Sequence, residues 1–571
     1  MKLTLITISL IVFALHVDAQ NEKFQINGSA RSYLFANQLN ISNDVDSITA
    51  KKSNYGHNLL DLGISAFPNK QTEVIGIFRI RNELGGFWGG GVNFDVRQLT
   101  LKGVAANVVR YEIGDIDLKM TPYTLFNHSE EGFLNESGLF SLRRNIVHYD
   151  LFYNNNQWRM QGAKVGFNLL PSNHIDKIEF KGHLTRQRPT GESGDPERLF
   201  GGGSINFVKN KNIAFAFNSV HLFDLTQTSA TDSSFLWNNV SSTNFHWQMY
   251  NNNFATMKIE GESGFSNSHF KHFSDLTTPL NSDEWFYDIS SSINLNSQSI
   301  KFNVGFKDVG KDFSAPGAQT KRVNFDKSPV PYQQFTNNYI GRTVTTTDII
   351  NGNTSNSRKI SESLMAYNVV YNNSNPYGNA TPNRKGAYLK CHNLDSGTIK
   401  NSYIEIYALQ ESAGSGTTRK KSFLLTKLGT DIAINEWIKH KQALLLNIGF
   451  RNEITLRGGQ DFEQINLTSN FIDVGLSYEF VKNLNILFGG KLWNAQGNEQ
   501  KEVRNSYNEI IDFEPLTINF TEQILACGLQ YDFGQGNALS LQYQNFTITD
   551  NVDQNVNYGI SEFIILFSLM F

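Results

Sequence analysis

Apolar and polar residues alternate along much of the C-terminal third of the chain. Between positions 471 and 480 nearly every second residue is a large apolar one, and the pattern recurs at 484–492, 525–533 and 539–544. A period of two places successive side chains on opposite faces of a β-strand. Short turns separate the first pair of segments and the second pair. The sequence therefore predicts two hairpins of strands about ten residues long, each with one apolar and one polar face.

The connections between these strands alternate in length. Short turns at 437–441, 481–483 and 534–537 take turns with long polar stretches at 457–469, 494–522 and 549–557. A soluble β-sandwich also has strands of alternating polarity, so alternation alone does not decide between the two architectures. Tight turns at one end and long loops at the other are typical of outer-membrane barrels. We therefore predict an all-β fold, a single large transmembrane antiparallel β-barrel of about 18–24 strands with short periplasmic turns and long extracellular loops.

In such a barrel the two faces of a strand meet different solvents. We expect lipid to contact the apolar face, which carries Ile472, Leu476, Ile486, Leu525, Leu529, Tyr531, Leu539 and Leu541. We expect water in the lumen to contact the polar face, which carries Asp473, Glu479, Lys491, Gln530, Asp532 and Gln542.

Two stretches lack this alternation. Residues 114–145 are irregular between two segments that read as strands, 108–113 and 147–153, and residues 309–359 are rich in Gly, Pro, Asn and Ser. Each is either a large extracellular loop or a segment folded into the lumen. Counting strands back from the C-terminus and forward from the N-terminus places residues 373–384 on opposite sides of the membrane. One strand is thus missing or misassigned, and we expect it within 309–359.

The N-terminus and the composition narrow the class further. Residues 1–19 combine Lys2, an apolar run from Leu3 to Leu15 and a small-residue cleavage pattern ending at Ala19, which predicts a secretory signal peptide and a mature chain of 20–571. The formal net charge is −3, without a basic patch for nucleic acid. The chain has 2 cysteines, too few for a disulfide-stapled scaffold. We therefore expect an exported protein that binds no nucleic acid.

The chain ends on the apolar stretch YGISEFIILFSLMF. Exposed to water, a terminal strand of this kind would be prone to aggregation, whereas a strand that closes a barrel in lipid has no open edge. The terminal Phe571, with apolar residues at alternate preceding positions, resembles the C-terminal signal of bacterial outer-membrane β-barrel proteins, and the Asn- and Phe-rich composition resembles those of Bacteroidota. The resemblance implies that Phe567, Leu569 and Phe571 act in targeting and barrel closure, with outer-membrane lipid and the barrel-insertion machinery as partners.

Charged residues gather in the irregular stretch 114–145. Its candidate constriction residues are Asp115, Asp117, Glu130, Glu131, Arg143 and Arg144. In porin-like barrels an inward-folded loop with acidic residues facing wall arginines sets the pore size and a transverse field. The other interpretation, which the sequence favours, is a solvated extracellular loop.

No catalytic, cofactor or metal site is predicted. The chain contains no G-x-S-x-G motif, and His269, His272 and Asp275 lie in a stretch that reads as loop, where their spacing fixes no geometry. Because about 20 strands enclose a lumen wide enough to conduct, we expect a porin-like channel for passive or selective diffusion of small solutes. The alternative is a non-conducting subunit or scaffold of an outer-membrane assembly, secretion or uptake complex with other envelope proteins as partners. The oligomeric state stays open.

Overall fold

The structure is a computed structural model. It describes residues 23–41, 52–84, 92–128, 135–150, 152, 154–171, 175–189, 196–225, 234–272, 280–296, 299–320, 372–393, 397–504, 510–554 and 557–571. The signal-peptide prediction for residues 1–19 falls outside these ranges, as do Glu130, Glu131 and Asp275.

Twenty-two strands account for most of the described chain. The first eleven are β1 (Phe24–Ile41), β2 (Lys52–Asn69), β3 (Thr72–Glu83), β4 (Val92–Ala105), β5 (Val109–Leu118), β6 (Trp158–Leu169), β7 (Lys177–Arg188), β8 (Glu197–Asn210), β9 (Ile213–Leu225), β10 (Ser234–Asn251) and β11 (Ala255–His272). The others are β12 (Leu280–Leu295), β13 (Ile300–Val309), β14 (Arg384–Asn393), β15 (Ile399–Gln410), β16 (Ser422–Ala433), β17 (Leu444–Arg457), β18 (Ile465–Val481), β19 (Leu484–Arg504), β20 (Ile510–Gly534), β21 (Asn537–Asp550) and β22 (Tyr558–Met570). The helical elements are α2 (Gly138–Asp150), the 3₁₀ turn η1 (Asn154–Asn156) and α5 (Ile434–Trp437).

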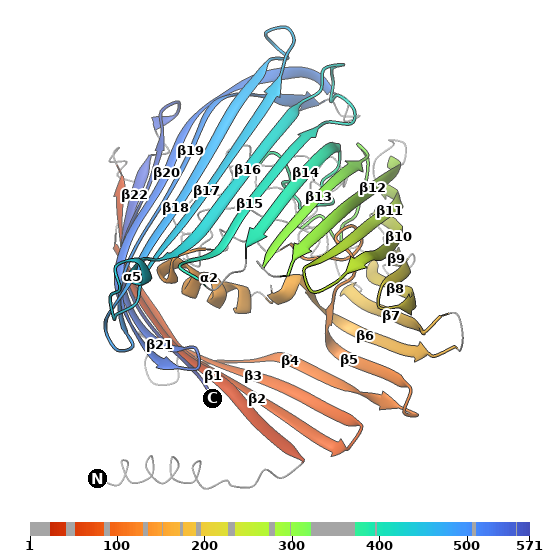
Figure 1. Cartoon of the computed structure of the whole chain (residues 1–571), viewed down its shortest axis with the longest axis horizontal. Coiled ribbons are helices and arrows are strands. Elements are labelled where there is room, and N and C mark those ends of the chain that lie inside the picture. Colours follow the sequence, from red (N-terminus) through yellow and green to blue (C-terminus); the bar gives the residue numbers. More distant parts are fainter. Residues whose placement is uncertain are drawn as a thin grey trace.

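The strands form one closed sheet (Figure 1). Each strand is antiparallel to the next along the chain, and β22 pairs with β1 over 13 residue positions, from Ser29 opposite Met570 to Ile41 opposite Tyr558. A closed sheet leaves no strand edge unpaired. The predicted all-β barrel is therefore confirmed, with 22 strands inside the expected range.

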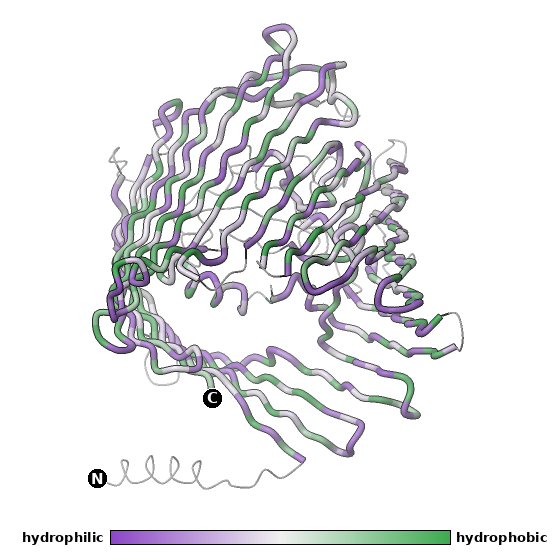
Figure 2. Tube along the Cα trace, viewed as in Figure 1, coloured by the Kyte–Doolittle hydropathy of each residue, from purple (hydrophilic) through white to green (hydrophobic). Residues whose placement is uncertain are grey.

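Outward and inward residues differ in polarity along each strand, and Figure 2 shows the alternation along the chain trace. Leu525 and Leu529 are 54% and 45% exposed, whereas Asp473 and Gln542 are each 2% exposed. Large apolar side chains on the outer face of a closed sheet need lipid as their solvent. Of the other residues expected to contact lipid, Ile472, Tyr531 and Leu541 are also exposed, and Leu476, Ile486 and Leu539 are half-buried. The barrel is thus a transmembrane protein. Among the described residues, no helix combines the length and apolar character needed to cross a bilayer.

Several stretches expected to be loops are strands instead. Strand β19 has 21 residues and β20 has 25, so much of 494–522 is extended and paired. Polar residues suit such strands because a bilayer is spanned by about 9–11 residues and the remainder projects beyond it. His269 and His272, which were expected in a loop, also lie on a strand, because β11 extends to His272.

The region before β6 differs most from expectation. Strand β5 extends to Leu118, and residues 138–150 form the helix α2, so the expected strand at 147–153 is wrong. Replacing one predicted strand by a helix changes the number of strands by one. This equals the disagreement between the strand counts made from the N-terminus and from the C-terminus. The strand expected within 309–359 falls largely on residues 321–371, outside the described ranges, and β13 pairs directly with β14 from Val309 opposite Arg384 onward.

Candidate functional site

Two long insertions follow β5 and β13, and their described residues lie in the space enclosed by the sheet. The first spans residues 119–157 and the second spans 310–383, of which 310–320 and 372–383 are described. Both leave the wall at the end opposite the short turns, the start of β1 and the end of β22. The first insertion contacts strands from around the ring, including β1, β3, β12, β19 and β22. A segment that reaches strands on different sides of a closed sheet lies in the lumen (Figure 1).

The two insertions hydrogen-bond to each other. The Phe126 backbone N–H donates to the Gly317 carbonyl at 2.8 Å, and the His128 N–H donates to Thr320 Oγ1 at 2.7 Å. The indole N–H of Trp158 on β6 donates to the same Gly317 carbonyl at 2.9 Å. Residues almost 200 positions apart thereby become one lumenal unit joined to the wall.

An apolar cluster holds this unit against β5–β13. Tyr123 stacks on Phe286 with ring centroids 4.3 Å apart, and Phe313 contacts the same Phe286 ring at 4.9 Å. Phe313 and Leu125 are completely buried. Burial of apolar side chains from both insertions against the wall fixes this part of the lumen as a packed core.

Hydroxyl groups of the first insertion also bond to wall carboxylates. Tyr123 donates to Asp288 at 2.7 Å, and Thr121 donates to Glu262 at 2.6 Å. Tyr388 of β14 donates to the second oxygen of Asp288 at 2.8 Å. Each carboxylate therefore positions a loop residue over the wall.

Helix α2 lies against the remaining side of the lumen. Ser137 precedes it, and its Oγ accepts the Leu139 N–H at 3.4 Å, as at a helix N-cap. The residues that face the wall are spaced three or four apart. Leu142 and Ile146 pack on the wall cluster of Tyr33, Phe35, Ile564 and Leu566, while Leu139 and Phe140 join a second cluster on β18–β22. Asn145 is exposed on the opposite side of the helix.

Charges fix the N-terminal end of α2. The Glu136 carboxylate pairs with Arg144 at 2.7 Å and with Lys491 of β19, which also pairs with Asp473 of β18 at 3.3 Å. Burial would raise the pKa of the Glu136 carboxyl, but Lys491 and Arg144 outweigh burial and hold this pKa below its ordinary value of 4.5. Glu136 is therefore ionised at neutral pH.

The middle of α2 carries a buried arginine. Arg143 is 1% exposed, pairs with the fully buried Glu562 of β22 at 3.5 Å, and bonds to Gln544 of β21. A buried charge of this kind needs a partner of opposite charge. Arg143 thus ties the helix to the strands that close the barrel.

Charges also fix the C-terminal end of α2. Asp150 bonds to Arg31 of β1 at 2.7 Å and to Arg79 of β3 at 3.0 Å. Burial would raise the pKa of Asp150, but the two guanidinium groups outweigh it and hold this pKa below its ordinary value of 3.8. The Arg97 guanidinium lies 4.1 Å above the Tyr149 ring. Three wall arginines therefore surround the last turn of the helix.

The structure separates the predicted constriction residues into two groups. Asp115 and Asp117 lie on β5, where Asp115 accepts the Leu99 N–H at 2.6 Å and Asp117 binds Arg159 at 2.5 and 2.8 Å. Arg143 and Arg144 lie on α2. Within the described ranges, no ion pair joins one group to the other. The wall partners Arg31, Arg79 and Glu562 were missed by sequence reasoning, whereas Lys491 and Asp473 lie on the lumenal face as expected.

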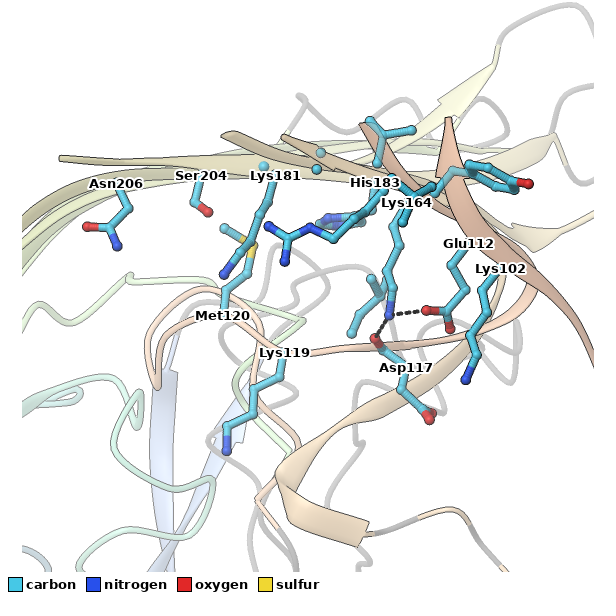
Figure 3. Close-up of a pocket in the computed structure, with 18 of the residues that line it drawn as sticks. Lys102, Glu112, Asp117, Lys119, Met120, Lys164, Lys181, His183, Ser204 and Asn206 are labelled. Carbon is cyan, nitrogen blue, oxygen red and sulfur yellow. Dashed lines mark hydrogen bonds and ion pairs between the residues drawn. The ribbon is translucent and has the colours of Figure 1, made fainter. Parts of the chain in front are cut away.

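A cavity of about 940 Å³ remains between the first insertion and the wall. It lies near the short-turn ends of β3–β10, beneath residues 117–125, and Figure 3 shows part of its lining. Six basic residues line it, Lys70, Lys102, Arg110, Lys119, Lys164 and Lys181, against the three acidic residues Glu73, Glu112 and Asp117. Each acid already has a basic partner: Lys102 pairs with Glu73 at 3.0 Å, Lys164 with Glu112 at 2.7 Å, and Arg159 with Asp117. The lining is therefore net positive.

Comparisons with known proteins give structural similarity alone. No protein-family model matches the sequence, and no curated protein matches it. The chain is similar in structure to a BenF-like porin from Pseudomonas fluorescens Pf-5, with 10% identity, a TM-score of 0.32, and coverage of 96% of this chain and 99% of that one. It is also similar to Pseudomonas aeruginosa OpdK with vanillate, at 7% identity, TM-score 0.35 and coverage of 96% and 99%. It is also similar to Pseudomonas aeruginosa OpdO, with 9% identity, a TM-score of 0.35, and coverage of 96% of this chain and 98% of that one. These similarities are too low to place the chain in a family.

Proposed function

We propose that this protein is a porin-like channel of the outer membrane for the passive or selective diffusion of small solutes. The observation that carries the proposal is the charged cavity of about 940 Å³ inside a closed 22-stranded wall. A sheet of this size encloses far more space than a packed core of wall side chains needs. Water and small polar solutes can occupy a space lined by lysine, arginine, serine and asparagine side chains.

The lumenal insertions supply the constriction in this proposal. Helix α2 narrows one side of the lumen and the joined segments 119–128, 310–320 and 372–383 narrow the other. Because the cavity lining is net positive, we expect the channel to favour small anions over cations of similar size.

A second function, a non-conducting scaffold, is favoured by one observation. Phe313, Ala315, Ala318, Tyr377 and Ala380 of the second insertion are completely buried, so this insertion fills part of the lumen. A barrel whose lumen was filled throughout would serve to present its long extracellular strands rather than to conduct.

Conductance of the purified protein in planar bilayers separates the two functions. A channel gives discrete current steps, and a salt gradient gives a reversal potential of the sign expected for anion preference. A scaffold gives a silent bilayer although heat-modifiable mobility shows that the barrel is folded. Lys119→Gln and Lys181→Gln, at two lining residues, should each reduce anion preference, whereas Lys258→Gln, on a strand outside the lining set, serves as the control.

We also propose that Phe567, Leu569 and Phe571 mark the chain for insertion. Their strand closes the sheet, and the Phe571 N–H donates to the Gly28 carbonyl at 3.0 Å while the Gly28 N–H donates to Phe571 at 2.9 Å. Replacing all three with serine should leave export intact but block assembly, since each lost apolar side chain costs roughly 1.5–3 kcal/mol. A triple variant that still reaches the outer membrane in heat-modifiable form would show that these residues only pack.

A further inference from the structure

Two neighbouring connections form a distinct surface at the short-turn rim of the barrel. One joins β16 to β17 and contains α5, residues 434–443, and the other is the turn at 482–483 between β18 and β19. They are adjacent because β17 pairs with β18 up to Leu444 opposite Tyr478. The Glu479 N–H then donates to the Ala443 carbonyl at 2.9 Å, which extends the contact into the connection itself.

The surface, called here the α5 rim, exposes four large apolar side chains. Trp437 and Ile438 are 62% and 60% exposed, and Phe480 and Val481 are 56% and 54% exposed. The connection is ordered by its own backbone bonds, from Ile438 N–H to Ile434 at 3.1 Å and from His440 N–H to Asn435 at 2.9 Å. These apolar side chains are therefore displayed by a fixed backbone.

The α5 rim lies on the lipid side of the wall. The His440 ring is 6.2 Å from the ring of Tyr478. Tyr478 is on the same face of β18 as Ile472 and Val474, which are 39% and 40% exposed. The connection thus extends over the outer face of the barrel rather than over its mouth.

Three lysines accompany the apolar residues. Lys439, Lys441 and Lys482 are exposed, and none of them forms an ion pair with another residue that the structure describes. The nearby carboxylates are engaged elsewhere: Glu436 pairs with Lys400 at 3.5 Å, and Glu479 accepts the Asn483 N–H at 2.9 Å. The rim therefore combines an exposed apolar patch with unneutralised positive charge.

We propose that the α5 rim binds the headgroup of an anionic phospholipid in the periplasmic leaflet. Tryptophan is stabilised at the boundary between acyl chains and headgroups, because its ring is apolar and its N–H is polar. Lysines at the same depth attract the phosphate of an anionic lipid. Trp437 and Ile438 contact the upper acyl chain, and Lys439 and Lys441 contact the phosphate. A free phosphate ion would use the lysines alone and leave the apolar patch without a partner.

Native mass spectrometry of the intact barrel, titrated with phosphatidylglycerol, tests this site. We expect the double variant Lys439→Ala/Lys441→Ala to lose roughly 10- to 100-fold in affinity for the lipid, since each lysine near a phosphate contributes a several-fold effect. The matched control is Lys209→Ala/Lys211→Ala, at two exposed lysines at the end of β8 and in the turn after it, which should bind as wild type does. Trp437→Ser should also weaken binding, although it leaves every charge in place.

Further measurements on the wild-type protein keep the test independent of how the variants fold. Binding should weaken as salt rises, because exposed charges are screened, and phosphatidylcholine should bind less tightly than phosphatidylglycerol. The proposal would be overturned if the lysine variant bound the lipid as tightly as wild type, or if the control variant lost as much affinity as the lysine variant. It would also be overturned if binding did not depend on salt. Displacement of the lipid by millimolar inorganic phosphate would identify a phosphate site instead. If the protein gave no current in planar bilayers, the channel function would fail but this proposal would stand, because it depends only on the position of the barrel in the membrane.

Discussion

The two sides of the lumen are occupied by the same chain in different ways. Against β5–β13, the segments 119–128, 310–320 and 372–383 pack as a continuous apolar core around Phe286 and Phe313. Against β1–β4 and β18–β22, α2 also buries apolar residues, but ion pairs fix both of its ends and its middle. Apolar contacts respond little to pH or salt, whereas ion pairs depend on the protonation of each partner. The comparison indicates that ion pairs hold α2 to the wall along its length, whereas apolar burial holds most of the opposite side.

The largest effect should follow removal of the buried charge partner of α2. Arg143→Met removes the guanidinium that pairs with the buried Glu562 carboxylate, and removing one partner of a buried pair costs about 3–5 kcal/mol. We expect α2 to lose hydrogen-exchange protection and the single-channel conductance to rise. The double variant Arg143→Met/Glu562→Met should restore much of the protection, and Asn145→Met, on the exposed side of the same helix, should have no effect. Full protection of α2 in the single variant would contradict a charge-fixed helix.

A cavity on the apolar side should lower the stability of the barrel without loosening α2. Leu125 is completely buried, and Leu125→Ala costs about 2–5 kcal/mol in a packed core. We expect a lower temperature for the loss of heat-modifiable mobility, while α2 keeps its hydrogen-exchange protection. The control is Leu170→Ala, at a side chain that is 78% exposed. Loss of α2 protection in Leu125→Ala would show that the two sides are one cooperative unit.

Neutralising the C-terminal anchor of α2 should have a smaller effect. Asp150→Asn keeps the shape of the side chain but removes its charge from between Arg31 and Arg79, and a hydrogen bond to a charged group contributes about 1.5–3 kcal/mol. We expect faster hydrogen exchange in the last turn of α2 and little change near Glu136. Uniform exchange along the whole helix would mean that its two ends are not held independently.

Most of the wall could be predicted from the sequence, and most of the lumen could not. A wall strand pairs with its neighbour in the chain, so a period of two and a short turn are sufficient to identify it. Helix α2 could not be recognised in this way, because Val147, Tyr149 and Leu151 place large apolar residues at every second position, as a strand does. The spacing of Leu139, Leu142 and Ile146 after Ser137 is the available signal for a helix. Its anchors are not local: Arg31 and Asp150 are 119 positions apart, and Arg79 and Asp150 are 71 apart.

The smallest effect concerns pH, and its direction follows from the carboxyls at the two ends of α2, Glu136 and Asp150. The pKa values of Glu136 and Asp150 lie below their ordinary values of 4.5 and 3.8. A depressed pKa contributes stability that is fully present above the unfolded value and is lost as the pH falls through the folded value. Conductance should therefore be the same at about pH 7 and about pH 5 and should rise only below about pH 4, where protonation releases both ends of α2. Asp150→Asn should already show part of this rise at neutral pH and respond less to acid. Because their lowered pKa values keep Glu136 and Asp150 ionised between about pH 7 and pH 5, a conductance change in that window would assign the response to another titratable group.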